Sequence, residues 1–166
     1  MYKLLIGDDE KNIRLGIQAM VKREFSHTFE ILVASDGLEA NEILKRESIH
    51  IIITDIKMPR LDGIQLIRII QEMKMKTSVI ILSGHDDFEY AKAAIKSKVK
   101  DYLLKPVNRN ELFQSLKKVL EELEAEQAKG IEQLDELRSS QLNYILLNQQ
   151  IDKEEIKQIC LNVQIL

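Results

Sequence analysis

Five short runs of apolar residues recur along the chain, and each is continuous rather than alternating with polar positions. Continuous runs of this length, rich in Ile, Val and Leu, are typical of strands that are buried on both faces of a parallel sheet. The pattern therefore predicts five strands, at residues 2–7, 29–34, 50–55, 78–83 and 101–106.

The stretches between these runs carry apolar residues at helical spacing. Such spacing is found at 13–21, 38–44, 64–70, 88–95 and 112–123, and it predicts amphipathic helices. Asp36 is placed to cap the second helix, and Asn108, with Glu111 three residues later, is placed to begin the last. Alternating strands and helices predict an α/β fold, a (βα)5 doubly wound parallel sheet with right-handed crossovers.

Reactive side chains follow four of the five predicted strands. Functional groups of open α/β sheets gather at the carboxyl ends of their strands, so these side chains are expected to meet at one edge. They are Asp8, Asp9 and Glu10 after the first strand, Asp55 after the third, Ser83 and Gly84 after the fourth, and Lys105 with Pro106 after the fifth. The second strand ends with nothing strongly reactive.

The residue types at this edge suggest phosphoryl chemistry. Asp8, Asp9 and Asp55 would repel one another unless they shared a cation or a proton, and such oxygen ligands suit Mg²⁺. Asp55 ends the most apolar strand and is the best nucleophile candidate, because a carboxylate can form an aspartyl-phosphate. Lys105 and Ser83 would then bind phosphoryl oxygens. Taken singly, each feature also fits a helix cap, a turn or the end of a strand. Together they indicate a site for phosphoryl transfer.

Composition narrows the class of protein further. The 166 residues carry a net charge of −3, which argues against a nucleic-acid-binding surface in this segment. The single cysteine, Cys160, excludes an intramolecular disulfide and a Cys-rich zinc site. The N-terminus does not resemble a signal peptide, and no apolar run approaches the ~18 residues of a membrane span. We expect a cytoplasmic protein without a membrane segment.

Three stretches together resemble the receiver domain of two-component response regulators. They are DDE at 8–10, DIKMPRLDG at 55–63 and SGHDDFEYAKAAIKSKVKDYLLKPV at 83–107, and the resemblance covers residues 1–124. It implies a flavodoxin-like sheet with strand order 2-1-3-4-5. The site would lie at the switch point between the first and third strands.

The resemblance also implies a role for each site residue. Asp55 would be the phosphoacceptor, and Mg²⁺ would be bound by Asp9, Asp55 and the Lys57 backbone carbonyl, with Asp8 acting through water. The phosphoryl-binding and switch residues would be Ser83, Gly84, Lys105 and Tyr102, and the Lys105–Pro106 peptide bond would be cis.

The C-terminal part of the chain predicts a long helix, from about residue 116 to 147. Leucines at 116, 120, 123, 134 and 137 fit a heptad pattern that Gln127 and Gly130 interrupt. Two interpretations stay open, a two-stranded coiled coil and a solvated helix that packs on its own domain. Residues 148–166 predict a further short helix. We therefore expect residues 125–166 to form a helical linker.

The amino-acid sequence of residues 86–107 resembles the corresponding segment of regulators that carry a C-terminal AraC-type DNA-binding domain. No such domain follows in this chain. The implied function is a phosphorylation-activated receiver that is not an enzyme beyond self-catalysed phosphotransfer and autodephosphorylation. Its expected partners are a sensor histidine kinase and a second copy, through the C-terminal helix or the 86–105 face. DNA would be bound only through the absent domain.

Two other functions remain as alternatives. One is a phosphatase or phosphotransferase of the haloacid-dehalogenase kind, which needs a second carboxylate where this chain has Lys57. The other is an interaction scaffold that is not phosphorylated.

Overall fold

A computed structural model of the chain describes residues 1–84 and 99–147. The predicted helix at 88–95, the short helix at 148–166 and the part of the 86–105 face up to residue 98 lie outside the described residues. The chain divides into two units, Met1–Val119 and Leu120–Leu166.

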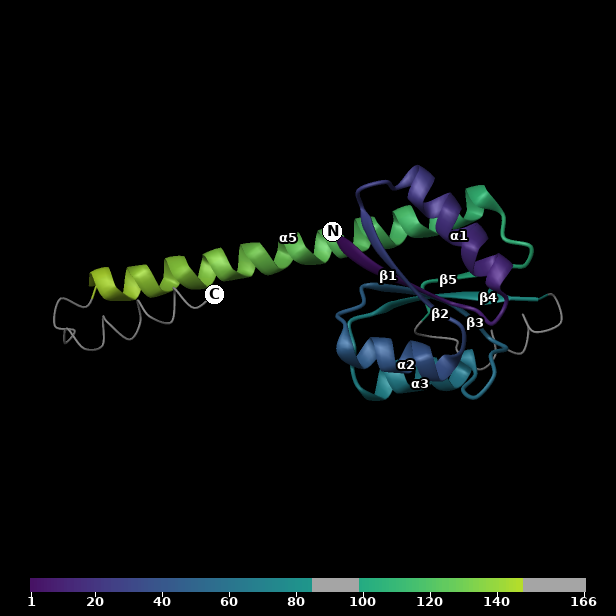
Figure 1. The fold of residues 1–166 in the computed structure, drawn as a ribbon. Helices are drawn as coiled ribbons and strands as arrows, with labels where there is room; N and C mark the ends of the chain where they lie inside the picture. The colour runs from purple at the N-terminus through teal and green to yellow at the C-terminus, as the bar shows by residue number, and fades with distance from the viewer. Residues whose placement is uncertain (85–98, 148–166) are drawn as a thin grey trace. The chain divides into compact units, whose positions relative to one another are not determined.

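A five-stranded parallel sheet forms the centre of the first unit (Figure 1). Its strands are β1 (Tyr2–Gly7), β2 (Phe29–Ala34), β3 (Ile51–Asp55), β4 (Ser78–Ser83) and β5 (Asp101–Leu104), and their spatial order is β2-β1-β3-β4-β5. The predicted fold class and strand order are confirmed. β5 ends two residues before the predicted end, and Pro106 has no N–H to continue the ladder.

Helices cover both faces of this sheet. They are α1 (Lys11–Glu24), α2 (Gly37–Arg46), α3 (Gly63–Glu72) and α5 (Arg109–Leu147). Figure 1 shows α2 and α3 together on one face, while α1 and the beginning of α5 lie on the other. Both faces are therefore buried, and all five residues of β3 are buried. This explains why the strands read as continuous apolar runs.

Side chains of β1, β3 and β4 pack against α2 and α3 to form the core on that face. Leu5, Ile52 and Ile81 have no exposed surface, and they contribute the apolar area that stabilises this layer. The helix starts are fixed by side chains, as expected for Asp36, which accepts a hydrogen bond from the Glu39 N–H at 3.0 Å. Asn108 likewise accepts hydrogen bonds from the N–H groups of Asn110 and Glu111.

The described part of the second unit is the portion of α5 that runs from Leu120 to Leu147. The prediction of a long helix here is confirmed, and neither Gln127 nor Gly130 breaks it. Several apolar side chains of this portion are exposed, namely Ile131, Leu137, Leu142 and Tyr144.

Candidate functional site

Strand register brings the predicted acids together at the carboxyl end of the sheet. Gly7 pairs with Thr54, so the next residues along the two strands, Asp8 and Asp55, stand at the same level. Asp9 follows in the loop that leads into α1. Each of the three carboxylates offers an oxygen atom, and these oxygens all lie within 4.8 Å of one another.

Lys105 lies among these carboxylates. Its Nζ is 2.8 Å from Asp8 Oδ2 and 3.0 Å from Asp55 Oδ2. Burial alone would lower the pKa of Lys105, but hydrogen bonding and charge attraction from Asp8 and Asp55 outweigh it and raise the pKa. The ammonium is therefore held protonated between two buried acids.

Glu10 is a third partner of this ammonium, with Oε1 3.3 Å from Nζ. Glu10 is one of the acids expected at this edge of the sheet, without a role of its own. It is the N-cap residue of α1, but its side chain makes no cap hydrogen bond. The carboxylate is turned towards Lys105, a residue 95 positions away, and nothing in the local sequence signals that contact.

Asp8 is fully buried, and its position is fixed by several contacts. Its N–H donates to the Ala34 carbonyl at 3.2 Å, and its Oδ1 accepts from the Glu10 N–H at 2.9 Å. Asp8 Oδ2 forms the ion pair with Lys105 at 2.8 Å, and no other described residue donates a hydrogen bond to it. A buried carboxylate oxygen in this condition has remaining capacity for a cation or a water.

Asp55 is also buried, and this perturbs its titration. The pKa of its carboxyl is raised, chiefly by burial and further by the nearby charge of Asp8, while Lys105 and a backbone hydrogen bond from Lys57 oppose the rise. The ionised form of Asp55 thus depends on neighbouring positive charge.

The loop after β3 is packed tightly beneath Asp55. Gly63 donates its N–H to the Ile56 carbonyl at 2.8 Å, and a Cβ on Gly63 would stand 2.2 Å from the Asp55 carbonyl oxygen. Asp62 caps α3 through a reciprocal capping box with Gln65. A cavity of about 510 Å³ opens beside the acids, lined by Asp9, Asp62, Ile64 and residues 56–59.

Ser83 lies at the end of β4, one residue beyond Leu82, the pairing partner of Asp55. Its side chain is fully buried, and Oγ has no hydrogen-bond partner among the described residues. The Ser83 carbonyl accepts from the Lys105 N–H at 2.9 Å, and Gly84 follows directly. The strand pairing thus places this hydroxyl at the same sheet edge as Asp55, with no hydrogen bond to any described residue.

Tyr102 and the Lys105–Pro106 bond complete the set of predicted residues. Tyr102 lies in β5 opposite Ile81 and is half-buried, packed against the core on the α2 and α3 face. Burial raises the pKa of its hydroxyl. The Lys105–Pro106 peptide bond is cis.

The three carboxylates fit a divalent cation. Their oxygens are close enough to share one ion, they are the hard ligands that Mg²⁺ prefers, and Asp8 Oδ2 retains acceptor capacity. Sequence reasoning missed Arg14, whose guanidinium donates to the Asp8 and Asp9 carbonyls at 2.5 and 3.1 Å.

A family model for the response regulator receiver domain matches residues 4–117. The chain belongs to this family. Among curated proteins, this receiver domain is similar to YesN of Bacillus subtilis, called a transcriptional regulatory protein, with 42% identity over 123 residues. That match covers 74% of this chain but 33% of YesN, so the chain spans about a third of that relative's length.

Two solved structures are also similar to this receiver domain. The REC domain of AraT, a response regulator from Geobacillus stearothermophilus, is 39% identical, with a TM-score of 0.69 and coverage of 76% of this chain and 98% of that one. A two-component transcriptional regulator called AraC, from Clostridium phytofermentans, is 37% identical, with a TM-score of 0.63 and coverage of 73% and 97%. Among the described residues, no helix combines the length and apolar character needed to cross a membrane.

Proposed function

We propose that this receiver domain accepts a phosphoryl group on Asp55 from a sensor histidine kinase in a Mg²⁺-dependent reaction. The observation that carries the proposal is the position of Lys105, whose Nζ lies 2.8 Å from Asp8 and 3.0 Å from Asp55. An ammonium placed beside a nucleophilic carboxylate can pair with a phosphoryl oxygen as that group arrives.

The proposed roles are those that the family resemblance implies for these residues. Asp9, Asp55 and the Lys57 carbonyl would hold Mg²⁺, with Asp8 acting through water; the ion, when bound, neutralises charge on the transferring group. An oxygen of Asp55 forms the new bond to phosphorus while the bond from phosphorus to the donor histidine nitrogen breaks. Lys105 pairs with one phosphoryl oxygen. The Ser83 hydroxyl and the backbone at Gly84 bind the others.

Phosphorylation would then act as a conformational switch. The phosphoryl group adds roughly −1.5 to −2 charge and strong acceptor oxygens. The Ser83 hydroxyl, which has unused hydrogen-bonding capacity, would turn towards them. The half-buried Tyr102 ring would move further inward, and the output face formed by residues 86–105 would change.

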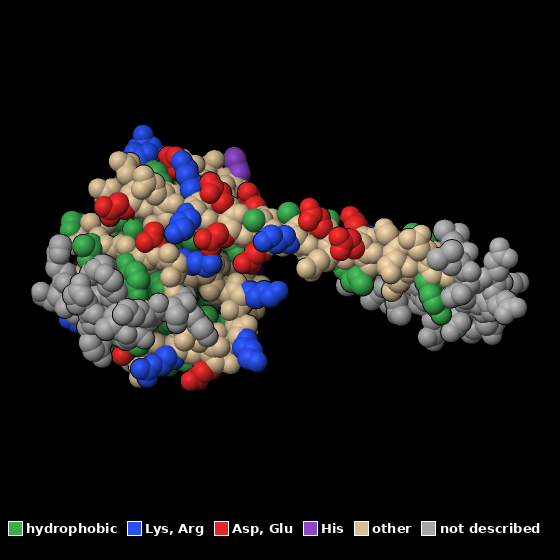
Figure 2. Space-filling model, turned by 180° about the vertical axis from the view of Figure 1, so that it is seen from behind, with side chains coloured by type: hydrophobic (Ala, Val, Ile, Leu, Met, Phe, Trp, Pro, Cys, Tyr) green, Lys and Arg blue, Asp and Glu red, His purple; other side chains and the backbone are tan. Residues whose placement is uncertain are grey.

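The output of this switch would be transcription. We propose that residues 1–124 are the receiver and that 125–166 link it to an AraC-type DNA-binding domain. The similar protein from Clostridium phytofermentans is called the transcriptional regulator AraC, which supports this subgroup. Figure 2 shows acidic and basic side chains interspersed on the face it presents, which favours DNA binding by a separate domain. We place the protein in the cytoplasm, and the exposed apolar residues of α5 would allow pairing with a second copy.

One experiment tests the phosphoacceptor. The chain is incubated with Mg²⁺ and a small acyl phosphate, and its intact mass is measured for the wild type and for Asp55→Asn. We expect one phosphate adduct in the wild type and none in the variant. An adduct that persists in Asp55→Asn would contradict the assignment. Rapid turnover of many phosphate esters would indicate a phosphatase, and no adduct in either protein would indicate a scaffold.

A further inference from the structure

Arg14, in the first turn of α1, reaches back to the loop that carries the two N-terminal acids. Helical side chains lean towards the N-terminus, so a long side chain here can reach the chain segment before the helix. Its Nη1 donates to the Asp8 carbonyl at 2.5 Å and to the Asp9 carbonyl at 3.1 Å. One guanidinium nitrogen therefore holds two consecutive peptide units.

The backbone N–H groups of α1 donate no hydrogen bond to these two carbonyls. The Ile13 and Arg14 N–H groups donate to the Glu10 carbonyl, which is the first acceptor of α1. The carbonyls of Asp8 and Asp9 precede it and lie outside the helical hydrogen-bond pattern. Arg14 supplies the donor that the backbone does not.

The two acids differ in how much they depend on this contact. Asp8 is also fixed through its N–H, its Oδ1 and its ion pair with Lys105. Asp9 is exposed, and its carboxylate makes no hydrogen bond with the described residues. The direction of the Asp9 side chain is therefore set by its backbone, and Arg14 is the side chain that holds that backbone.

The first turn of α2 provides a negative charge near Arg14. Glu39 Oε2 accepts from the Ser35 N–H and hydroxyl, both at 2.7 Å. These hydrogen bonds are the main reason that the pKa of the Glu39 carboxyl is lowered, and the charge of Arg14 contributes further. An ionised Glu39 offsets part of the charge that Arg14 brings to the site.

We propose that Arg14 is a positioning residue that sets the direction of the Asp9 carboxylate for binding a divalent cation. This rests on the proposed metal-binding function. By charge alone, a guanidinium so near the site repels a cation. Positioning and charge thus predict opposite effects when Arg14 is removed.

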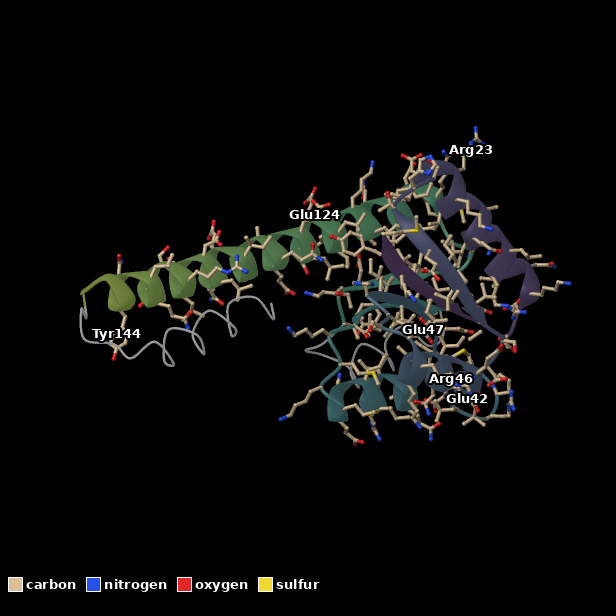
Figure 3. The ribbon with its side chains drawn as sticks, turned by 60° about the vertical axis from the view of Figure 1, so that its left-hand side comes forward. Arg23, Glu42, Arg46, Glu47, Glu124 and Tyr144 are labelled. Carbon is tan, nitrogen blue, oxygen red and sulfur yellow. The ribbon has the colours of Figure 1, made fainter. Side chains whose placement is uncertain are left out.

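The test is the Mg²⁺ dissociation constant of the unphosphorylated protein, measured by calorimetric titration for the wild type, Arg14→Ala and Arg14→Lys. Loss of a residue that orients a metal ligand typically weakens metal binding about 10-fold or more. We expect a weakening of that order in Arg14→Ala and a smaller one in Arg14→Lys, which keeps a donor. Arg23→Ala is the matched control, because Arg23 lies in the last turn of the same helix and points outward (Figure 3).

The outcomes separate the two proposals. Binding in Arg14→Ala that is unchanged or tighter than in the wild type overturns the positioning role, while the metal site itself stands. A wild type that binds no Mg²⁺ overturns both. If Arg14→Ala does not fold, Arg14→Lys decides the question, since affinity equal to that of the wild type and of Arg23→Ala contradicts the role.

Discussion

Gly63 lies against Asp55 so closely that its missing Cβ is a requirement of the site. A Cβ at this position would stand 2.2 Å from the Asp55 carbonyl oxygen and 3.0 Å from the Ile56 Cα. The backbone of the proposed phosphoacceptor therefore rests on the first turn of α3. Any side chain there must displace β3, α3 or both.

We predict that Gly63→Ala destabilises the receiver by about 1–3 kcal/mol, the usual cost of forcing extra atoms into a packed region. Urea unfolding gives the measurement. Gly16→Ala is the control, because Gly16 lies in α1 with open space around its Cβ position, and alanine there should stabilise the helix by about 0.5–1 kcal/mol. Equal stability of the two variants would contradict the packing argument.

Removing the charge of Lys105 should leave Asp8 and Asp55 as uncompensated buried anions. In metal-free buffer, Lys105→Met is expected to lower the free energy of unfolding by on the order of 3 kcal/mol. The double variant Lys105→Met/Asp55→Asn also removes one of the two uncompensated carboxylates. It should recover part of the lost free energy of unfolding. A double variant less stable than Lys105→Met would show that the destabilisation is not electrostatic.

Asp36 gives a prediction about pH. The pKa of its carboxyl lies below the ordinary value of 3.8, first because it accepts the Glu39 N–H and then because it pairs with Arg60. A lowered pKa stabilises the fold above the unfolded-state value, and this contribution is lost as pH falls through the folded-state value. Asp36→Asn keeps an N-cap acceptor but no charge. We expect Asp36→Asn to have a lower free energy of unfolding than the wild type at pH 7. This difference should narrow towards pH 3.

Urea unfolding across this pH range checks this difference. Arg60→Ala provides the comparison, because Arg60 is the partner of Asp36 across the loop after β3. If the pair matters, the two substitutions should be non-additive in the double variant at pH 7. If the stability difference between the wild type and Asp36→Asn widens as pH falls, the ionised Asp36 carboxylate does not stabilise the fold.

Ser83→Ala should separate stability from switching. The Ser83 hydroxyl is buried without a hydrogen-bond partner among the described residues. Because the substitution removes an unsatisfied polar group, we expect a free energy of unfolding within about 1 kcal/mol of the wild type, or slightly higher. Phosphorylation of the variant should no longer shift the NMR resonances of the Tyr102 ring.

Ser115→Ala is the matched control for this variant. Ser115 is also buried, but its hydroxyl donates to Asp101 Oδ2 at 2.5 Å. Its loss should cost about 1–3 kcal/mol, because a hydrogen bond to a charged acceptor is removed, while the Tyr102 response persists. A Ser83→Ala protein as destabilised as Ser115→Ala would mean that the Ser83 hydroxyl has a structural partner.

The sequence predicts the sheet and the strand-end residues well, because both depend on local pattern. Asp8, Asp55 and Lys105 meet because parallel strands bring their carboxyl ends to one edge, and that much follows from counting strands. The contacts of Glu10 with Lys105 and of Asp36 with Arg60 were not predictable. They join loops far apart in the chain, and side-chain direction in a loop is not encoded by periodicity.

The contacts just after the end of β2 could not be predicted from the sequence either. The sequence predicts nothing strongly reactive at the end of this strand. In the structure, Asp36 pairs with Arg60, and Glu39 lies near Arg14. Only the folded arrangement shows that this strand end supports the loops on either side of it.

The contacts of Lys105 have a consequence for electroneutrality. Asp8, Asp9 and Asp55 share one sheet edge with Lys105, and Glu10 lies 3.3 Å from the same ammonium. Carboxyl groups thus outnumber the amine in this cluster, and a divalent ion would offset more negative charge there than Na⁺ or K⁺ would. The excess of acids over bases therefore favours an ion of higher valence before ligand geometry distinguishes one divalent metal from another.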